Sequence, residues 1–110
     1  MEQGDIYLAR LDPTEGNEQA GTRPAVIVSG PSMNEAYNLV WILPLSSKVK
    51  NFASCLKLKK KSLNGLKSDS EVITYQIRSI SKKRLLKKMG RVEKQELGLI
   101  LANVLEILTI

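Results

Sequence analysis

Short apolar runs separated by turn-forming residues make up most of this chain. The runs lie at 6–11, 24–29, 39–45, 52–60 and 71–77, and glycine, proline or asparagine stands in most of the stretches between them. Runs of this length and spacing predict β-strands. The run 39–45 is the most apolar, so we expect a central strand there, with Pro44 marking its end or a bulge. Residues 52–60 alternate between apolar and polar with the period of two that is typical of a half-buried strand.

Smaller elements are predicted between and after these strands. Asn64 followed by Gly65 is a strong signal for a tight turn. Ser81 is placed to cap a brief helical turn over 82–85, because its hydroxyl can accept a hydrogen bond from the first turn. Residues 88–92 are expected to add one more short strand.

The last part of the chain has the pattern of an amphipathic helix. Its apolar residues recur at spacings of three and four and form one stripe: Leu97, Ile100, Leu101, Val104 and Leu108. Glu93 and Glu96 suit the positive N-terminal end of such a helix. We therefore predict a single domain over residues 1–110, mainly β with α, in which about five to seven short strands form a small antiparallel barrel or curled sheet, followed by a C-terminal helix.

The composition excludes several kinds of chemistry. The 110 residues include no histidine and a single cysteine, Cys55. Without histidine there is no imidazole base and most transition-metal sites are disfavoured, and one cysteine cannot form an internal disulfide. We therefore expect no metal and no cofactor. No apolar stretch has the length of a membrane span and polar residues follow Met1, so we expect a cytoplasmic protein with no membrane partner.

The net charge of +6 is concentrated in one half of the chain. Residues 1–47 hold two basic and six acidic side chains, whereas residues 48–94 hold fifteen basic and three acidic ones. This imbalance favours a polyanionic partner such as a nucleic acid. A solvated lysine-rich surface would give the same numbers, so charge alone leaves both interpretations open.

Arg23 stands directly before the apolar run 24–29. Pro24 restricts the residue before it to extended backbone angles, and proline is tolerated at the first residue of a strand because no ladder donor is needed there. Arg23 should therefore enter the sheet with its backbone direction largely settled. Its guanidinium is a planar fork of donors that matches phosphate oxygens. Arg23 is either an ordinary surface residue or a group aimed at an anion.

Polar stretches at the strand ends are most simply turn residues when each is taken alone. Taken in order, the chain reads GDIY at 4–7, LDPTEGNEQ at 11–19, RPAVIVS at 23–29, PLSS at 44–47 and YQIRS at 75–79. This series resembles the MazF/PemK toxin family, whose members typically read GDIY, a LDPT-x-G-x-EQ loop, RPAVVVS, PITS or PLTS, and DQIRT. Residues 81–92 and the closing helix resemble the family too, so the resemblance covers nearly the whole chain.

The resemblance implies a barrel similar to an SH3 fold, of the CcdB type, and a homodimer. It also implies a type II toxin that cleaves single-stranded RNA without a metal, and a cognate antitoxin whose disordered, acidic C-terminal tail covers the RNA groove. The family's catalytic pair falls on Arg23 and Ser46, with Ser47 and Gln76 in support. The residues expected to bind RNA are Thr14, Glu18, Gln19, Lys48, Lys50 and Arg78.

Three positions depart from the family pattern. Serine at position 46 replaces the usual threonine, which keeps the hydroxyl but loses the methyl that stiffens the rotamer. Tyr75 replaces an acidic residue, and Glu71 stands where valine or isoleucine is common. Exposed aromatic residues stack on RNA bases; Tyr37 is one candidate, whereas Trp41 lies inside the central apolar run and is predicted in the core.

The implied reaction needs little from the protein. RNA carries its own nucleophile, the 2′-hydroxyl, and its attack gives a 2′,3′-cyclic phosphate and a 5′-hydroxyl end. Arg23 is assigned electrostatic stabilisation of the crowded phosphorane, because arginine is a poor proton acceptor. Two alternatives keep the fold. One is a CcdB-like gyrase-poisoning toxin, although residues 105–110 lack the tryptophan of that type, and the other is a barrel that binds RNA without cutting it.

Overall fold

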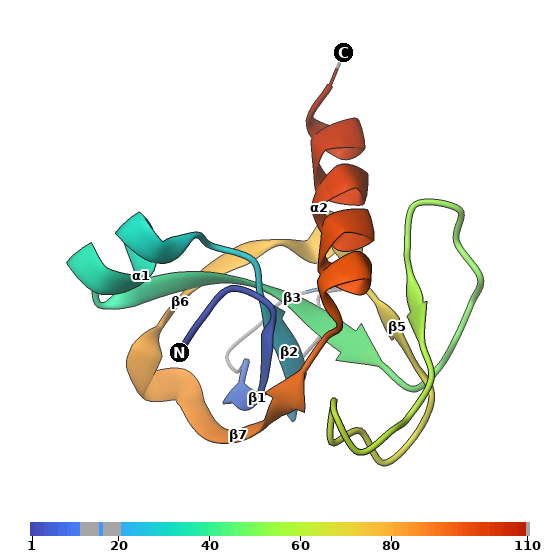
Figure 1. Ribbon diagram of the computed structural model, residues 1–110, viewed down its shortest axis with the longest axis horizontal. Helices are drawn as coiled ribbons and strands as arrows, with labels where there is room; N and C mark the ends of the chain where they lie inside the picture. The colour runs from blue at the N-terminus through green and yellow to red at the C-terminus, as the bar shows by residue number, and fades with distance from the viewer. Residues whose placement is uncertain (12–15, 17–20, 110) are drawn as a thin grey trace.

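The computed structural model describes residues 1–11, 16 and 21–109. Its elements follow the order β1 (Asp5–Arg10), β2 (Thr22–Ile27), α1 (Pro31–Ala36), β3 (Leu39–Ser46), β4 (Lys57–Leu58), β5 (Ser70–Val72), η1 (Thr74–Gln76), β6 (Arg78–Ser81), η2 (Lys82–Arg84), β7 (Leu85–Arg91) and α2 (Lys94–Leu108), where η denotes a 3₁₀ turn. The strands form one antiparallel sheet in the order β4-β5-β3-β2-β1-β7, and β6 pairs with β3. Figure 1 shows the sheet curling, with α2 as the single long helix, which confirms the predicted fold class.

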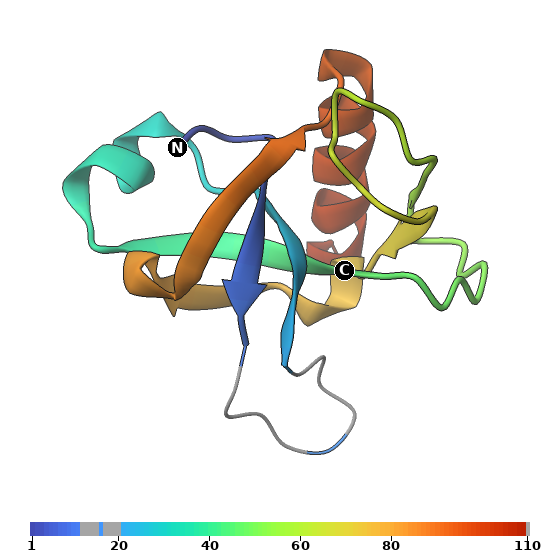
Figure 2. The ribbon, with the colours of Figure 1, turned by 90° about the horizontal axis from the view of Figure 1, so that it is seen from below.

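Apolar side chains pack on both faces of the sheet. Successive residues of a strand point to opposite faces, and accordingly Val26 belongs to one buried cluster while Ile27 belongs to the other. Helix α2, seen beside the sheet in Figure 2, covers the first cluster with Ile100, which is completely buried. Leu97, Leu101 and Val104 pack there as well, as the sequence predicts. The last member of the predicted stripe does not, because Leu108 is 69% exposed.

The N-terminal half of β3 is covered on one face only. Val40 and Ile42 are buried, whereas Leu39 and Trp41, which alternate with them, are 44% and 48% exposed. The prediction of a core Trp41 is therefore wrong. An uninterrupted apolar run is typical of a strand buried on both faces, but here it belongs to a strand whose second face is left open.

Pro44 does not end β3, which continues to Ser46. The effect of the proline is seen instead in the segment around Ile73, which lies next to it and where the strand pairing is interrupted. The carbonyl of Pro44 accepts the N–H of Ile73 at 2.9 Å, so the polar groups of residue 44 face that neighbour, and proline has no N–H to return. The predicted strand 71–77 is therefore wrong beyond Val72, where β5 ends. η1 follows, and β6 begins only after the predicted run, where Arg78 lies opposite Ile42.

The predicted strand over 52–60 is also wrong, because only β4 pairs there, with β5. Backbone groups that would extend the ladder are bonded to side chains instead. The carbonyl of Lys59 accepts a hydrogen bond from the Asn64 amide at 2.9 Å, and the N–H of Lys60 donates to the Asp69 carboxylate at 2.8 Å. A period-two pattern carries no information about such local competitors for the backbone.

The start of α2 is fixed by charged side chains. The Glu96 carboxylate accepts the N–H of Glu93 at 2.8 Å, and the Glu93 side chain caps the first turn in return. The Lys61 ammonium donates a hydrogen bond to the Glu93 carboxylate, and its Nζ lies 3.6 Å from Oε2 of Glu96. The hydrogen bond to Glu93 raises the pKa of Lys61, which therefore stays charged. None of the helices among the described residues has the length and apolar character that a membrane crossing requires.

Two glycines allow the chain segment before β5 to lie directly on β7. Gly65 has a φ of +66°, and a Cβ there would meet the carbonyl oxygen of Met89 at 2.1 Å. A Cβ on Gly90 would meet the carbonyl oxygen of Leu63 at 2.2 Å, and that same oxygen accepts the N–H of Arg91 at 3.0 Å. Only glycine permits this approach of two backbones. The contact places residues 65–68 beside β7, where they form one wall of the cleft described next.

Candidate functional site

Arg23 lies near the beginning of β2, opposite Ala9 of β1. Pro24 is the next residue of the strand and lies opposite Leu8, so the prediction that proline directs Arg23 into the sheet is confirmed. The Arg23 residue is half-buried. Its backbone is thus held in the ladder while its long side chain reaches the surface.

Ser46 is the last residue of β3. The register between β2 and β3 pairs Ala25 with Pro44, and the same register continued by two residues sets Arg23 opposite Ser46. Opposed positions of neighbouring strands share one face of a sheet. Ser46 is only 7% exposed, and its Oγ accepts the N–H of Lys48 at 3.2 Å. The hydroxyl oxygen of Ser46 is therefore held by the N–H of Lys48, and its hydroxyl proton can still be donated to another acceptor.

Ser47, the next residue, is exposed and lines a surface cleft together with Arg23. The cleft has a volume of about 530 Å³ and opens between the ends of β1, β2 and β3, the segment 65–70 and β7. Leu8, Pro24 and Leu45 form its apolar floor. The structure therefore brings Arg23 and Ser47 to one cavity, whereas Ser46, the predicted partner of Arg23, is buried and does not line it.

The charge of this cleft has one sign. Its cations are Arg23, Lys67, Lys87 and Lys88, and none of the described residues that line it is acidic. Hydroxyl groups of Thr22, Ser47, Ser68 and Ser70 line it as well. Guanidinium, ammonium and hydroxyl groups all donate hydrogen bonds, and this is the donor set that phosphate oxygens require.

The remaining predicted residues that the structure describes do not line the cleft. Thr14, Glu18 and Gln19 fall outside the described residues. Lys48 and Lys50 lie beyond the cleft, and Gln76 belongs to η1. Arg78 donates from Nη1 to the carbonyl of Leu11 at 3.2 Å, so it supports the base of the β1–β2 connection. Sequence reasoning missed Lys67, Lys87 and Lys88, whose shared cleft depends on the packing of a loop against β7.

Sequence reasoning also missed the role of Glu71, although its presence among apolar strand residues was a visible signal. Glu71 is completely buried and lies opposite Ser46 in the ladder. Its two carboxylate oxygens accept the N–H groups of Lys50 and Phe52, each at 3.0 Å. A buried carboxylate needs such donors to offset the hydration that it gives up. Glu71 thereby holds the loop that follows the two serines.

Replacing Glu71 by glutamine should loosen that loop. One acceptor oxygen becomes an amide NH₂, so either Lys50 or Phe52 loses its partner, at a cost of about 1–3 kcal/mol in the free energy of unfolding. Hydrogen exchange of these two amides should become faster. Glu35→Gln removes the same charge from an exposed position of α1 and should change stability by no more than about 0.5 kcal/mol. Unchanged amide protection in Glu71→Gln would refute this role.

Phe52 and Tyr75 form an exposed aromatic pair next to this loop. Their ring centroids are 5.8 Å apart and the planes meet at 77°, an edge-to-face arrangement. Partial burial raises the pKa of Tyr75, and the neighbouring Cys55 and Glu71 act in the same direction. Tyr75 therefore remains a phenol at neutral pH.

Comparison with known proteins gives one consistent result. Residues 2–108 match the profile of the PemK-like, MazF-like toxins of type II toxin–antitoxin systems. The chain is 33% identical over 103 residues to "Endoribonuclease MazF9" of Mycobacterium tuberculosis, an alignment that covers 89% of this chain and 87% of that protein.

Solved structures of similar proteins share the fold. The crystal structure of MazF from Deinococcus radiodurans superimposes with a TM-score of 0.86 at 22% identity, over 100% of this chain and 97% of the other. A mycobacterial endoribonuclease in complex with its cognate antitoxin gives a TM-score of 0.81 at 18% identity, over 98% and 94% of the two chains.

Proposed function

The chain belongs to the family of PemK-like, MazF-like toxins of type II toxin–antitoxin systems, and from that premise we propose that it is an endoribonuclease that cleaves single-stranded RNA without a metal ion. The observation that carries this proposal is the cleft in which Arg23 and Ser47 lie among cations and hydroxyls with no acidic residue described in its lining. The similarity to a protein named as an endoribonuclease supports the same reaction.

The reaction follows from the groups at the sheet end. The 2′-oxygen of the substrate attacks the adjacent phosphorus and loses its proton, while the bond from phosphorus to the 5′-oxygen breaks and that oxygen gains a proton. Negative charge grows on the non-bridging oxygens in the transition state. Arg23 faces that charge with a fork of donors, so its contact is stronger in the transition state than in the ground state. The hydroxyl of Ser46 donates to a second oxygen, with Ser47 beside it.

We propose two protein partners as well. An antitoxin with a disordered, acidic C-terminal tail would fit the same positively charged cleft and thereby exclude RNA. This pairing is supported by the similarity to an endoribonuclease whose structure contains its cognate antitoxin. Because the substrate is cellular RNA, we place the activity in the cytoplasm.

The second partner is another copy of this chain. Figure 1 shows the C-terminal turns of α2 extending past the sheet, where Leu105 and Leu108 are 64% and 69% exposed. Apolar side chains grouped on one exposed helix end mark an interaction surface. None of the α2 residues that the structure describes lines the cleft. Sedimentation velocity should give twice the 12.2 kDa mass of one chain.

A cleavage assay in EDTA tests the proposed reaction. Purified protein should cut a long single-stranded RNA in the presence of EDTA, and the fragments should carry 2′,3′-cyclic phosphate and 5′-hydroxyl ends. A requirement for added magnesium would contradict the metal-free mechanism. Fragments with 5′-phosphate ends would mean that water rather than the 2′-oxygen attacks. Salt-dependent binding without any cutting would instead identify a non-catalytic RNA-binding barrel.

A further inference from the structure

We propose that Lys67, Lys87 and Lys88 form a subsite for a backbone phosphate of the RNA, next to the phosphate that Arg23 contacts. This inference rests on the proposed function, because it takes single-stranded RNA as the occupant of the cleft. It adds three residues that no motif of the sequence points to. The cleft that contains Arg23 extends to all three lysines, so one RNA strand can contact Arg23 and the lysine subsite at the same time.

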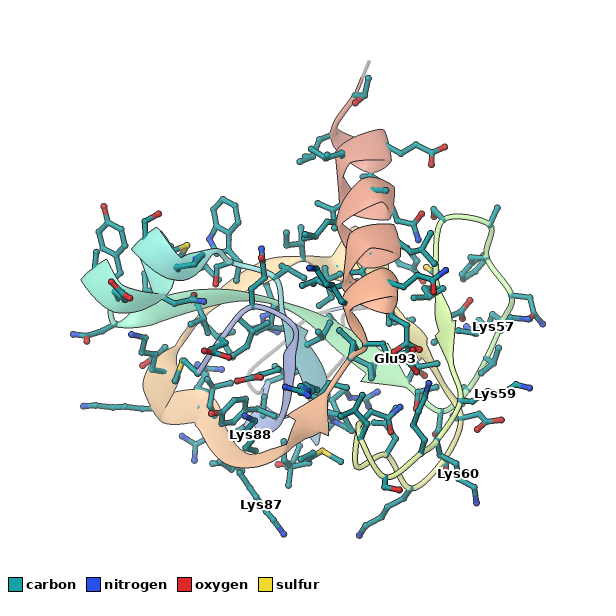
Figure 3. The ribbon with its side chains drawn as sticks, in the orientation of Figure 1. Lys57, Lys59, Lys60, Lys87, Lys88 and Glu93 are labelled. Carbon is teal, nitrogen blue, oxygen red and sulfur yellow. The ribbon has the colours of Figure 1, made fainter. Side chains whose placement is uncertain are left out.

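Two consecutive lysines of β7 reach the cleft. Lys87 and Lys88 lie opposite Leu8 and Tyr7 of β1. Both lysines line the cleft, and Figure 3 labels both on β7. Because lysine side chains are long, their ammonium groups can reach the rim of a cleft from either side of a strand.

The segment that carries Lys67 is held in place before any ligand binds. Asn64 is 1% exposed, and its side-chain oxygen Oδ1 accepts the backbone N–H groups of Lys61 at 3.2 Å and Leu66 at 3.0 Å. The glycine contacts with β7 hold the same segment from the other side. A preorganised backbone of this kind reduces the entropic cost of binding an ion.

The lysines of the cleft differ in how far their charge is already neutralised. The Lys88 ammonium lies 3.5 Å from the carboxylate of Asp5, which is 3% exposed and also accepts the N–H of Glu2. The ammonium groups of Lys67 and Lys87, by contrast, make no hydrogen bond or ion pair with any residue that the structure describes. These two therefore carry the largest uncompensated charge, and a phosphate that displaces their counterions gains affinity.

A double substitution tests the subsite by binding rather than by cleavage. The probe is a short oligoribonucleotide with one 2′-deoxynucleotide at the scissile position, which lacks the attacking hydroxyl and cannot be cut. Lys67→Ala with Lys87→Ala should raise the Kd of this probe about tenfold or more at moderate salt. The slope of log Kd against log salt should fall by about 0.7 for each phosphate that the double variant no longer neutralises.

Lys59→Ala with Lys60→Ala provides a matched control. It removes the same charge from exposed lysines that Figure 3 shows at the side of the molecule near β4, outside the cleft. The control should change the slope by much less than the cleft variant, and both should unfold at the urea concentration of the unsubstituted protein.

Three outcomes would overturn the subsite. They are equal effects of the two double variants, an unchanged slope in the cleft variant, and loss of binding to an acidic antitoxin peptide with RNA binding intact. Cleavage by the unsubstituted protein together with any of these would leave the proposed function standing while the subsite fails. A slope change without cleavage by the unsubstituted protein would support the subsite and refute the reaction.

Discussion

Arg23→Ala is expected to lower the rate of RNA cleavage by about 10²–10³-fold, which is the cost of removing one donor from a preorganised site of charge stabilisation. Pro24 and the ladder to β1 hold the backbone of Arg23, so the point from which its side chain extends into the cleft is set before RNA binds. The loss should fall mainly on kcat, because the contact strengthens as charge develops on the phosphate oxygens. Single-turnover cleavage at saturating protein measures this directly.

Arg23→Lys separates charge from geometry. Lysine keeps the positive charge but offers a point charge instead of a planar fork. If bidentate contact with two phosphate oxygens matters, Arg23→Lys should recover only a small part of the rate that Arg23→Ala forfeits. Binding of the uncleavable RNA should change far less than the rate in both variants. A rate for Arg23→Ala within about threefold of the unsubstituted protein would exclude Arg23 from the catalytic centre.

The strands that could be predicted from the sequence are those that the sheet buries on at least one face. The runs that became β1, β2 and β3 are visible as apolar stretches, and the C-terminal helix as a stripe. The run at 52–60 misled because its alternation is real but only β4 pairs with β5, and the backbone groups of Lys59 and Lys60 that would continue the ladder are bonded to side chains. Trp41 misled for a related reason, since an apolar run does not say whether both faces of the strand are covered.

The residues of the candidate site also fall into those that could be predicted from the sequence and those that could not. Arg23 could be found because the resemblance to the toxin family places a catalytic arginine there, and the direction of its backbone could be predicted because proline constrains the residue before it, which is a local effect. The lysine subsite could not be found, because Lys67 is brought to the cleft beside β7 by the approach of Gly65 and Gly90 to facing backbones. Those features belong to tertiary packing. Glu71 lies between these cases, because a charge within an apolar strand signals a role without indicating its partners.

The remaining choice is between the two serines that follow the apolar part of β3. Ser46 is nearly buried, and its oxygen is fixed by the N–H of Lys48. The pairing of β2 with β3 ends at Ala25 and Pro44, two residues before Ser46, which lies opposite Glu71, and Glu71 also holds the loop behind it. Ser47 is exposed and lines the cleft, but its hydroxyl makes no hydrogen bond to any other residue that the structure describes. A donor fixed in advance stabilises a transition state more than a freely rotating one.

Ser46→Ala should therefore reduce kcat by about 10²-fold, and Ser47→Ala by less than about tenfold. Ser46→Thr is the informative control, because it keeps the hydroxyl and adds the methyl group that restricts its rotamers. It should retain most of the activity, whereas a purely structural role for residue 46 would make Ala and Thr differ mainly in stability. Cleavage rates and urea unfolding, measured on all three variants, distinguish these cases. A larger loss in Ser47→Ala than in Ser46→Ala would reassign the donor to the hydroxyl that lines the cleft beside Arg23.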